Sequence, residues 1–591
     1  MHSRNRVLAS TTFGLAALTL TASFTGCGLL ETSKPRQELQ NIENAKVGTD
    51  AYVPATLMIG DQPATLFTST DNRIAFRMGE STRLLDEGME VKGGNRVGLK
   101  QNGDHLYAYW WSHEKAKAIY FTSSQDGGKT FAPVQIVNDN SGVLAPFSIM
   151  TGKDGVVAMT YMDEREPKYE VFFNRSTDHG KTWPRPDQRL DNKPASGDSM
   201  AMFPRTIQTD SAWVTVWTNT IESMGQKSHQ VLARRSLDQG LTWSEETLIY
   251  QDKNVLTSME VSGQGHAMVV AFDIKGHGLG ALVTKDDGAT WKSVGFLENG
   301  QTTVNSGIDI QVNGNLAHLV WSEQSAKTPK ASVMAATIDI AQGAWKGTGK
   351  RIDAKPFYNT RTVFPHVITT QEGHVVAAWM DFRDIRPNIY MSASFDNGAS
   401  WSAPQPLGEP GKLAHGLPRL YPSGKDILLA YQTYPGDRQN EGHYIVERIE
   451  LDPPKGIKGM AKPQSMSEEK RKEMLQSRAN ELWKLRVEGK FEETYPFHDP
   501  AYKAATSLDH FRMRIGNIKY NNAVMQQIVE IQENVAKVKF TVNYSVNSVP
   551  VNGRIINIPP HDTEVTTTWV WVHDNWYLMF EPAVGKPYLK Y

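Results

Sequence analysis

The chain has 591 residues, more than one hydrophobic core supports, so at least two folded units are expected. Its 63 Lys and Arg residues balance 64 Asp and Glu residues, which leaves no basic excess to neutralise phosphates and argues against nucleic acid as a partner. The 47 glycines, 30 prolines and 15 tryptophans are typical of many short strands joined by tight turns, so a mostly β protein is predicted.

The first 27 residues have the features of an export signal. Arg4 and Arg6 give a basic start, residues 7–24 are mostly apolar and uncharged, and small residues lead to the single cysteine, Cys27. This order resembles a bacterial lipoprotein signal with the lipobox Phe24-Thr25-Gly26-Cys27, in which Phe24 stands where Leu is usual.

The lipoprotein resemblance implies cleavage before Cys27 and acylation of that residue. The acyl chains would hold the protein on a bacterial membrane, in the cell envelope and outside the cytoplasm. An ordinary secretory signal with an incidental cysteine is the alternative. Residues 28–54 are interpreted as a linker.

One eight-residue motif recurs along the centre of the chain. It reads Ser176-x-Asp178-x-Gly180-x-Thr182-Trp183 in one copy, and a decayed copy holds Thr337, Asp339 and Trp345. Successive aspartates lie 48 to 60 residues apart, the period of repeated four-stranded blades. The five good copies contain Asp126, Asp178, Asp238, Asp286 and Asp396.

The chemistry of the motif predicts a structural turn. An Asx-type side chain caps neighbouring backbone amides, and the glycine supplies a positive φ. No copy provides the additional carboxylates of a calcium loop, so no metal is predicted, and no motif indicates a cofactor.

Seven units of alternating apolar strands accompany the boxes, with strands such as 105–111, 211–217 and 427–431. The seventh unit has no box. Ser69-x-Asp71 resembles a further decayed copy, and a strand near 73–78 is expected to complete the last blade and close the ring. The boxes are similar to the bacterial neuraminidase repeats of the sialidase-like superfamily. The resemblance implies an all-β propeller over residues 55–455, with seven blades or, alternatively, six.

The propeller topology predicts where a ligand site would lie. Innermost strands begin on a top face, loops between second and third strands return to it, and the boxes lie on the opposite side. Candidates at the innermost strands are Arg96, Arg205, Arg419 and His366. The loops add Glu114, Asp163, Arg165, Asp381 and Arg383.

The sialidase resemblance implies an arginine cluster for a sugar carboxylate, a Tyr–Glu nucleophile pair and a separate acid. Arg96, Arg205 and Arg419 are the candidate cluster, at equivalent starts of three innermost strands. Glu260, Tyr421 and Glu114 are the catalytic candidates. The sequence departs from the family where Asn95-Arg96-Val97-Gly98 replaces a Phe/Tyr-Arg-Ile-Pro motif. Salt bridges between blades, with Asp163 and Asp381, are the alternative role of the arginines.

The composition changes after Asp452-Pro453-Pro454, and residues 456–465 are interpreted as a second linker. Ser465 and Glu468 are expected to open a helix that ends near Gly489, followed by strands at about 522–532, 535–548, 563–573 and 576–581. This small α+β unit over 466–591 resembles the nuclear-transport-factor-two-like cone, which implies a ligand mouth or a surface for a protein partner.

Together these features predict an envelope-anchored, sialidase-like propeller that binds a carbohydrate or other anionic ligand on its top face. Hydrolysis of the exo-sialidase type is the enzymatic version of this function. The competing hypothesis is a non-catalytic envelope scaffold for protein partners.

Overall fold

The computed structural model describes residues 36–579 with short gaps at 48–49, 114–116, 140–141, 165–167, 193–197, 224, 299–302, 326–330, 354–361, 385, 409–412, 435–441, 461–465, 500–501, 504–505, 514–517, 533–534, 552–553 and 573–574. The predicted signal, the lipobox and Cys27 lie outside the described residues.

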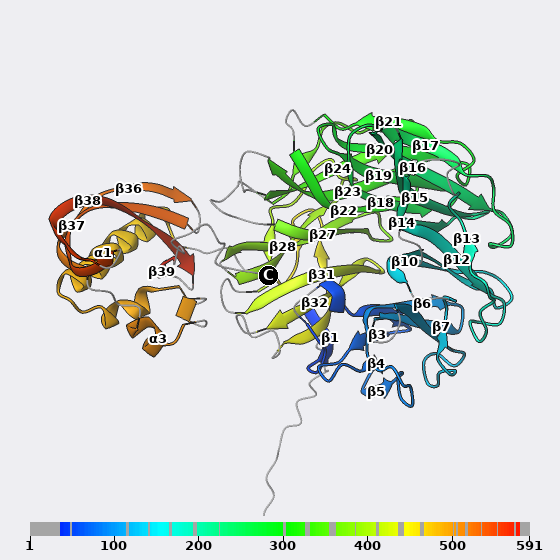
Figure 1. Cartoon of the computed structure of the whole chain (residues 1–591), viewed down its shortest axis with the longest axis horizontal. Helices are drawn as coiled ribbons and strands as arrows, with labels where there is room; N and C mark the ends of the chain where they lie inside the picture. Colours follow the sequence, from blue (N-terminus) through cyan, green and yellow to red (C-terminus); the bar gives the residue numbers. More distant parts are fainter. Residues whose placement is uncertain are drawn as a thin grey trace, which may run out of the picture. The chain divides into compact units, whose positions relative to one another are not determined.

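Eight antiparallel sheets of four principal strands follow one another between residues 36 and 449 (Figure 1). We call them blades 1 to 8. Blade 1 contains β2 (Ala55–Ile59), β3 (Gln62–Thr68), β4 (Ile74–Met78) and β5 (Ser81–Leu84). Blade 2 contains β6 (Asn95–Asn102), β7 (His105–Ser112), β8 (Ala118–Ser124) and β9 (Gln135–Ile136). Blade 3 contains β10 (Val143–Thr151), β11 (Val157–Asp163), β12 (Glu170–Ser176) and β13 (Gln188–Arg189).

The next four blades repeat this order. Blade 4 contains β14 (Asp198–Gln208), β15 (Trp213–Ser223), β16 (Gln226–Ser236) and β17 (Thr247–Asp252). Blade 5 contains β18 (Leu256–Gln264), β19 (Ala267–Ile274), β20 (Gly278–Thr284) and β21 (Lys292–Phe296). Blade 6 contains β22 (Thr303–Asn313), β23 (Leu316–Ser325), β24 (Ala331–Asp339), β25 (Ala344–Trp345) and β26 (Lys350–Arg351). Blade 7 contains β27 (Thr362–Thr369), β28 (Val375–Asp384), β29 (Arg386–Ser394) and β30 (Gln405–Pro406).

Blade 8 joins the two ends of the described repeat region. Its strands β31 (Ala414–Ser423), β32 (Asp426–Tyr434) and β33 (His443–Ile449) come late in the chain, and its outermost strand is β1 (Arg36–Ile42). Innermost strands of consecutive blades touch from β2 through β31, and blades 8 and 1 share an apolar core that includes Ile42, Phe67 and Tyr444. The series is therefore a closed ring, consistent with a propeller.

The predicted blade number is wrong, and so is the predicted closure. The structure describes eight blades rather than seven or six, because blade 1 has short strands and no box. The segment near 73–78 is the third strand of blade 1. The closing strand β1 instead lies within residues 28–54, which the sequence indicated as a linker.

Ser69 and Asp71 do not form a decayed box. They lie between the second and third strands of blade 1, whereas the boxes lie between third and fourth strands. The Ser69 hydroxyl donates to Asp71, and the Arg73 N–H donates to the Ser69 oxygen over 3.0 Å. The resemblance therefore comes from an independent turn that uses the same Ser–Asp pairing.

Middle strands of the blades are apolar because both of their faces are covered. All seven residues of β11 are buried, whereas all four residues of the outermost strand β5 are exposed. This gradient across a blade explains why the second strands are the clearest apolar signals in the sequence.

The five Asp boxes share one set of hydrogen bonds. In the turn at Asp178, Oδ1 accepts from the Ser176 hydroxyl (2.7 Å) and from the Thr182 N–H (2.9 Å), and Oδ2 accepts from the Thr182 hydroxyl (2.7 Å). The same pattern recurs in the turns of Asp126, Asp238, Asp286 and Asp396. Each carboxylate thus cross-links the two sides of its turn.

The boxes also hold neighbouring blades together. Gly180 has φ 80°, and a Cβ there would lie 2.0 Å from the Phe121 ring of the preceding blade. Trp183 packs edge-on against the same ring, with centroids 5.2 Å apart. The glycine of the motif is therefore required both by backbone conformation and by contact between blades.

The C-terminal unit is α+β. Its elements are α1 (Glu468–Val487), η3 (Glu492–Phe497), α3 (Leu508–Arg512), and a sheet of β36 (Ile518–Gln532), β37 (Val535–Val551), β38 (Arg554–Val572) and β39 (Asn575–Leu578). The helix cap is Ser467, whose oxygen accepts from the Lys470 N–H, and the expected Ser465 lies outside the described residues. Leu475, Leu482 and Trp483 pack on the sheet around Trp569 and Trp571.

Three smaller elements complete the described chain: η1 (Asp50–Tyr52), and the paired strands β34 (Leu451–Asp452) and β35 (Gly456–Ile457). None of the helices in the described segments is long and apolar enough to cross a membrane.

Candidate functional site

The innermost strands carry a repeated irregularity at the end of the ring opposite the Asp boxes. Pairing with the second strand skips two residues between Asn95 and Gly98, Leu144 and Phe147, Met202 and Arg205, Ser306 and Asp309, Val363 and His366, and Gly416 and Arg419. Each is a β-bulge, and bulges redirect side chains at the rims of closed sheets. The bulges therefore place a set of equivalent residues around the central axis.

The first skipped residue is left-handed in five of these strands. The φ values are 50° at Arg96, 55° at Phe203, 57° at Gly307, 53° at Phe364 and 53° at Leu417. A left-handed backbone costs a bulky residue about 1–3 kcal/mol, and such strain concentrates at functional sites.

The three arginines are not at equivalent positions. Arg205 and Arg419 are the first residues paired after their bulges, whereas the residue in that place in blade 2 is Gly98. Arg96 occupies the left-handed position two residues earlier. The sequence missed this offset because the register shift depends on pairing with the second strand.

Arg96 and Arg419 line one cavity of about 410 Å³. Its walls come from blades 1, 2, 3 and 8 and include Tyr109, Phe147 and Tyr421, with Asp50 from the segment before β2. Among the described residues, neither arginine forms an ion pair with a carboxylate. The cavity therefore presents two cations from opposite ends of the sequence beside aromatic side chains.

Asp309 and His366 are two of the ionisable neighbours of Arg419. The His366 Nε2 lies 3.9 Å from Asp309 Oδ2, and the Leu420 N–H donates to His366 Nδ1 over 3.3 Å. Burial raises the pKa of Asp309 to about 6, against hydrogen bonding from the Val367 N–H and the charge of Arg419. Burial, with the charge of Arg419, lowers the pKa of His366 to about 3, so this imidazole is neutral at physiological pH.

The two cavity tyrosines are protonated groups. Burial raises the pKa of Tyr109 to about 12. Burial also raises the pKa of Tyr421, although the charge of Arg419 and a hydrogen bond from the Thr56 backbone oppose the shift. At neutral pH both hydroxyls are therefore available as neutral hydrogen-bonding groups.

Arg205 and Glu260 form a pair between blades 4 and 5. The Arg205 Nε and Nη2 donate to the two Glu260 oxygens over 3.1 and 2.8 Å, a bidentate arrangement. Neither residue is among those that line the Arg96–Arg419 cavity. The structure thus places Glu260 on Arg205 and not beside Tyr421.

The remaining predicted residues lie apart from the cavity. Arg383 Nη2 lies 2.6 Å from Asp381 Oδ2 and 2.6 Å from the Asp353 carbonyl oxygen, and its guanidinium stacks on Tyr390. Both members of this pair are buried, as is Asp163. Glu114 and Arg165 lie outside the described residues.

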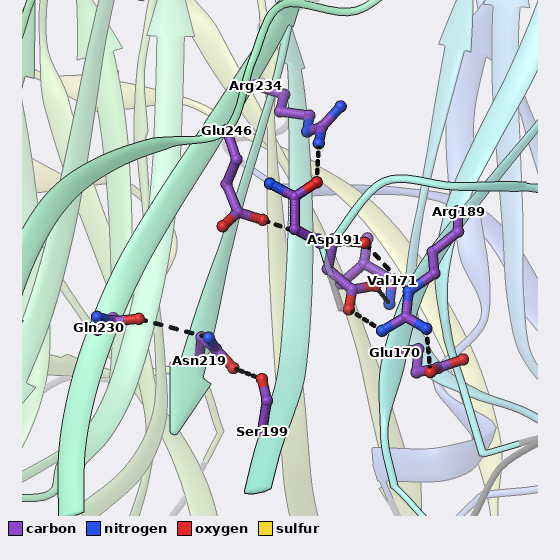
Figure 2. A network of polar contacts seen from close by, with 10 residues as sticks. Glu170, Val171, Arg189, Asp191, Ser199, Asn219, Gln230, Arg234 and Glu246 are labelled. Atoms are coloured by element: carbon purple, nitrogen blue, oxygen red, sulfur yellow. Dashed lines mark hydrogen bonds and ion pairs between the residues drawn. The ribbon is translucent and has the colours of Figure 1, made fainter. Parts of the chain in front are cut away.

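A further polar network links blades 3 and 4, and Figure 2 shows its members. Arg189 contacts Glu170 and Asp191, and Asp191 Oδ1 accepts from the Val171 N–H over 2.7 Å. Asn192 then bridges to blade 4, where its oxygen accepts from Arg234 over 2.6 Å.

This arrangement has a sequence signal separate from that of the boxes. Arg351-Ile352-Asp353 repeats Arg189-Leu190-Asp191, and Asp353 likewise accepts from the backbone of a third strand, at Val333 over 3.0 Å. The repeated Arg-apolar-Asp triplet begins at the last residue of β13 and of β26. It marks the two places where an aspartate side chain accepts a hydrogen bond from the backbone of the third strand. They are structural, since their carboxylates are committed to backbone N–H groups.

In the parts of the chain that the structure describes, no group of three or more His, Cys, Asp or Glu side chains is arranged to hold a metal ion. No protein-family model matches the chain, and comparison with curated proteins finds no match either.

Comparison with solved structures finds distant similarities. They include polysaccharide lyase Uly1 (TM-score 0.40, 11% identity, 70% of this chain and 100% of that chain) and a mutant of the NanB sialidase from Streptococcus pneumoniae (0.31, 11%, 70% and 92%). A polysaccharide lyase of family PL25, an ulvan lyase, is a third (0.38, 8%, 58% and 92%).

Proposed function

We propose that the chain binds an acidic carbohydrate in the Arg96–Arg419 cavity at the bulged end of the ring. The supporting observation is that two arginines, from blades 2 and 8, line one cavity of about 410 Å³ and form no ion pair within the described residues. Asp50 also lines the cavity and Asp309 partly offsets Arg419, but neither of these described carboxylates forms an ion pair with the two guanidiniums, and a sugar carboxylate would match their planar donors. Tyr109 and Tyr421 supply neutral hydrogen bonds for sugar hydroxyls.

The proposal is for binding rather than hydrolysis. The sialidase resemblance requires a carboxylate beside a tyrosine nucleophile. In the described residues the recorded hydrogen bond to Tyr421 comes from the Thr56 backbone, and Glu260 is held by Arg205. A concave cationic cavity also favours a small anionic ligand over a scaffold role for this face. A protein partner for the C-terminal unit stays a prediction.

Arg419→Met tests the binding proposal, because methionine keeps much of the aliphatic stem and removes the charge. We expect a loss of about 1.5–3 kcal/mol in affinity for galacturonate, the range for a hydrogen bond to a charged group. Isothermal titration of the purified full chain measures it. Arg96→Met is expected to weaken binding in the same direction.

Arg205→Met is the matched control. Its guanidinium is bound to Glu260, so its loss should lower stability slightly and leave galacturonate affinity unchanged. Equal losses for the Arg205 and Arg419 variants, or no binding by the unmodified protein, would contradict the proposed site.

A further inference from the structure

Two phenylalanines at the bulged end of the ring are both strained and exposed. Phe203 in blade 4 has φ 55° and Phe364 in blade 7 has φ 53°, and their exposed fractions are 46% and 37%. Glycine adopts a left-handed backbone without strain, as Gly307 does at the same position of blade 6. A phenylalanine there is unfavourable for the backbone and exposes apolar surface, so folding alone does not account for it.

Both phenylalanines lie at the same end of the ring as the proposed carbohydrate site, although neither lines the Arg96–Arg419 cavity. They occupy the bulge position that Arg96 occupies in blade 2, and equivalent positions on innermost strands lie at one end of a closed ring. A Cβ on Gly307 would lie 3.1 Å from Pro365 Cδ of the next blade, so a side chain at this position starts against the neighbouring innermost strand. The phenylalanines therefore lie around the axis with part of each side chain open to solvent.

In the described parts of β18 and β22, the innermost strands between the two phenylalanines, no large apolar side chain is exposed. Blade 5 contributes Glu260, which pairs with Arg205, and blade 6 contributes Gly307 and Asp309. The two rings are therefore separate platforms rather than one continuous apolar patch, which disfavours an apolar protein segment as the occupant. Aromatic faces carry a negative quadrupole and pack against the C–H faces of sugar rings, whereas a carboxylate requires the arginines.

We propose that Phe203 and Phe364 are stacking subsites for an acidic oligosaccharide that spans the opening while one of its carboxylates lies between Arg96 and Arg419. The inference rests on the proposed function and deepens it, because it assigns an oligosaccharide rather than a single acidic sugar as the ligand. The left-handed backbone sets the direction in which each side chain leaves its strand.

The test compares trigalacturonate with galacturonate, titrated into the full chain and into its Phe203→Gly and Phe364→Gly variants. Glycine removes the ring and relieves the left-handed strain, so the melting temperature should change little. We expect each variant to bind trigalacturonate three- to tenfold more weakly, about the contribution of one aromatic contact, and galacturonate unchanged. Phe203→Tyr, which keeps the aromatic face, should retain the unmodified affinity for both ligands.

The outcomes separate the two proposals. If the unmodified chain binds both sugars and the glycine variants bind trigalacturonate equally well, the stacking subsites are overturned and the cavity stands. If the variants lose both ligands in proportion to a lower melting temperature, the phenylalanines are packing residues and the inference fails. If the unmodified chain binds neither sugar, the proposed function fails and the inference fails with it.

Discussion

At the scale of single residues, the ionisation of Asp309 determines how strongly Arg419 attracts an anion. The pKa of Asp309 is raised to about 6 by burial, so the carboxyl is ionised at pH 7.5 and neutral at pH 5. Its negative charge at pH 7.5 offsets Arg419 and opposes an anionic ligand. His366, whose pKa is about 3, stays neutral across this range, so it contributes no opposing change.

We therefore predict that affinity for galacturonate rises as the pH falls from 7.5 to 5. The sugar stays ionised in this range, while protonation of Asp309 removes a repulsion of about 1 kcal/mol, or about fivefold in affinity. Titrations at several pH values measure the effect. Asp309→Asn should bind as tightly at pH 7.5 as at pH 5, and a pH dependence that persists in this variant would show that another group is responsible.

At the scale of elements, the Asp box is a local turn whose hydrogen bonds fall within seven residues, Ser176 to Thr182. Hydrogen bonds from Ser176 and Thr182 outweigh the effect of burial and lower the pKa of Asp178, so the ionised carboxylate stabilises the turn at neutral pH. That contribution is present above the ordinary pKa of an aspartate and is lost as the pH falls through the lowered value.

Asp178→Ala should accordingly reduce the free energy of unfolding by about 1 kcal/mol or somewhat more, as expected for a lost turn cap. Denaturant titration at pH 7 measures this loss. Asp178→Asn keeps an oxygen acceptor and should lose less. Because the boxes and the bulges lie at opposite ends of the blades, galacturonate affinity should be unaffected. A large loss of binding at unchanged stability would show that the ligand binds at the end that carries the boxes.

At the scale of the whole molecule, the ring depends on a strand from each end of the repeat region. Arg36 of β1 pairs with Glu447 of β33, with Nη2 and Oε2 2.6 Å apart, and Ile42 is fully buried in the core that blades 8 and 1 share. Such closure covers the apolar faces of the first and last blades, which an open series of sheets would leave exposed.

We also propose that the protein is a lipoprotein of the bacterial envelope, anchored through Cys27, which precedes β1 in the sequence. Cys27→Ser removes the acylation site, so the expressed protein should move from the detergent phase to the aqueous phase in Triton X-114 partitioning, or stay as an unprocessed precursor. Unchanged partitioning would rule out the anchor. Cys27→Ala should behave like the serine variant.

The sequence by itself determined those features whose bonds are local. The Asp boxes could be predicted because all of their donors and acceptors fall within a few residues, and the second strands because both of their faces are covered by neighbouring blades. Three of the four strands of the C-terminal sheet were also predicted within about four residues of their observed bounds, since long alternating segments carry a strong periodic signal, whereas β38 begins at Arg554 and not near residue 563.

Only the tertiary structure decided the number of blades, the closing strand and the partners of the site residues. Blade 1 has no box, and β1 pairs with a strand about 400 residues later. Arg96 and Arg419 line one cavity, and Arg205 pairs with Glu260. Both arrangements depend on closure of the ring and on a two-residue register shift in the innermost strands. Neither leaves a local pattern in the sequence, because hydrogen bonds between distant strands and contacts between blades exist only once the chain has folded.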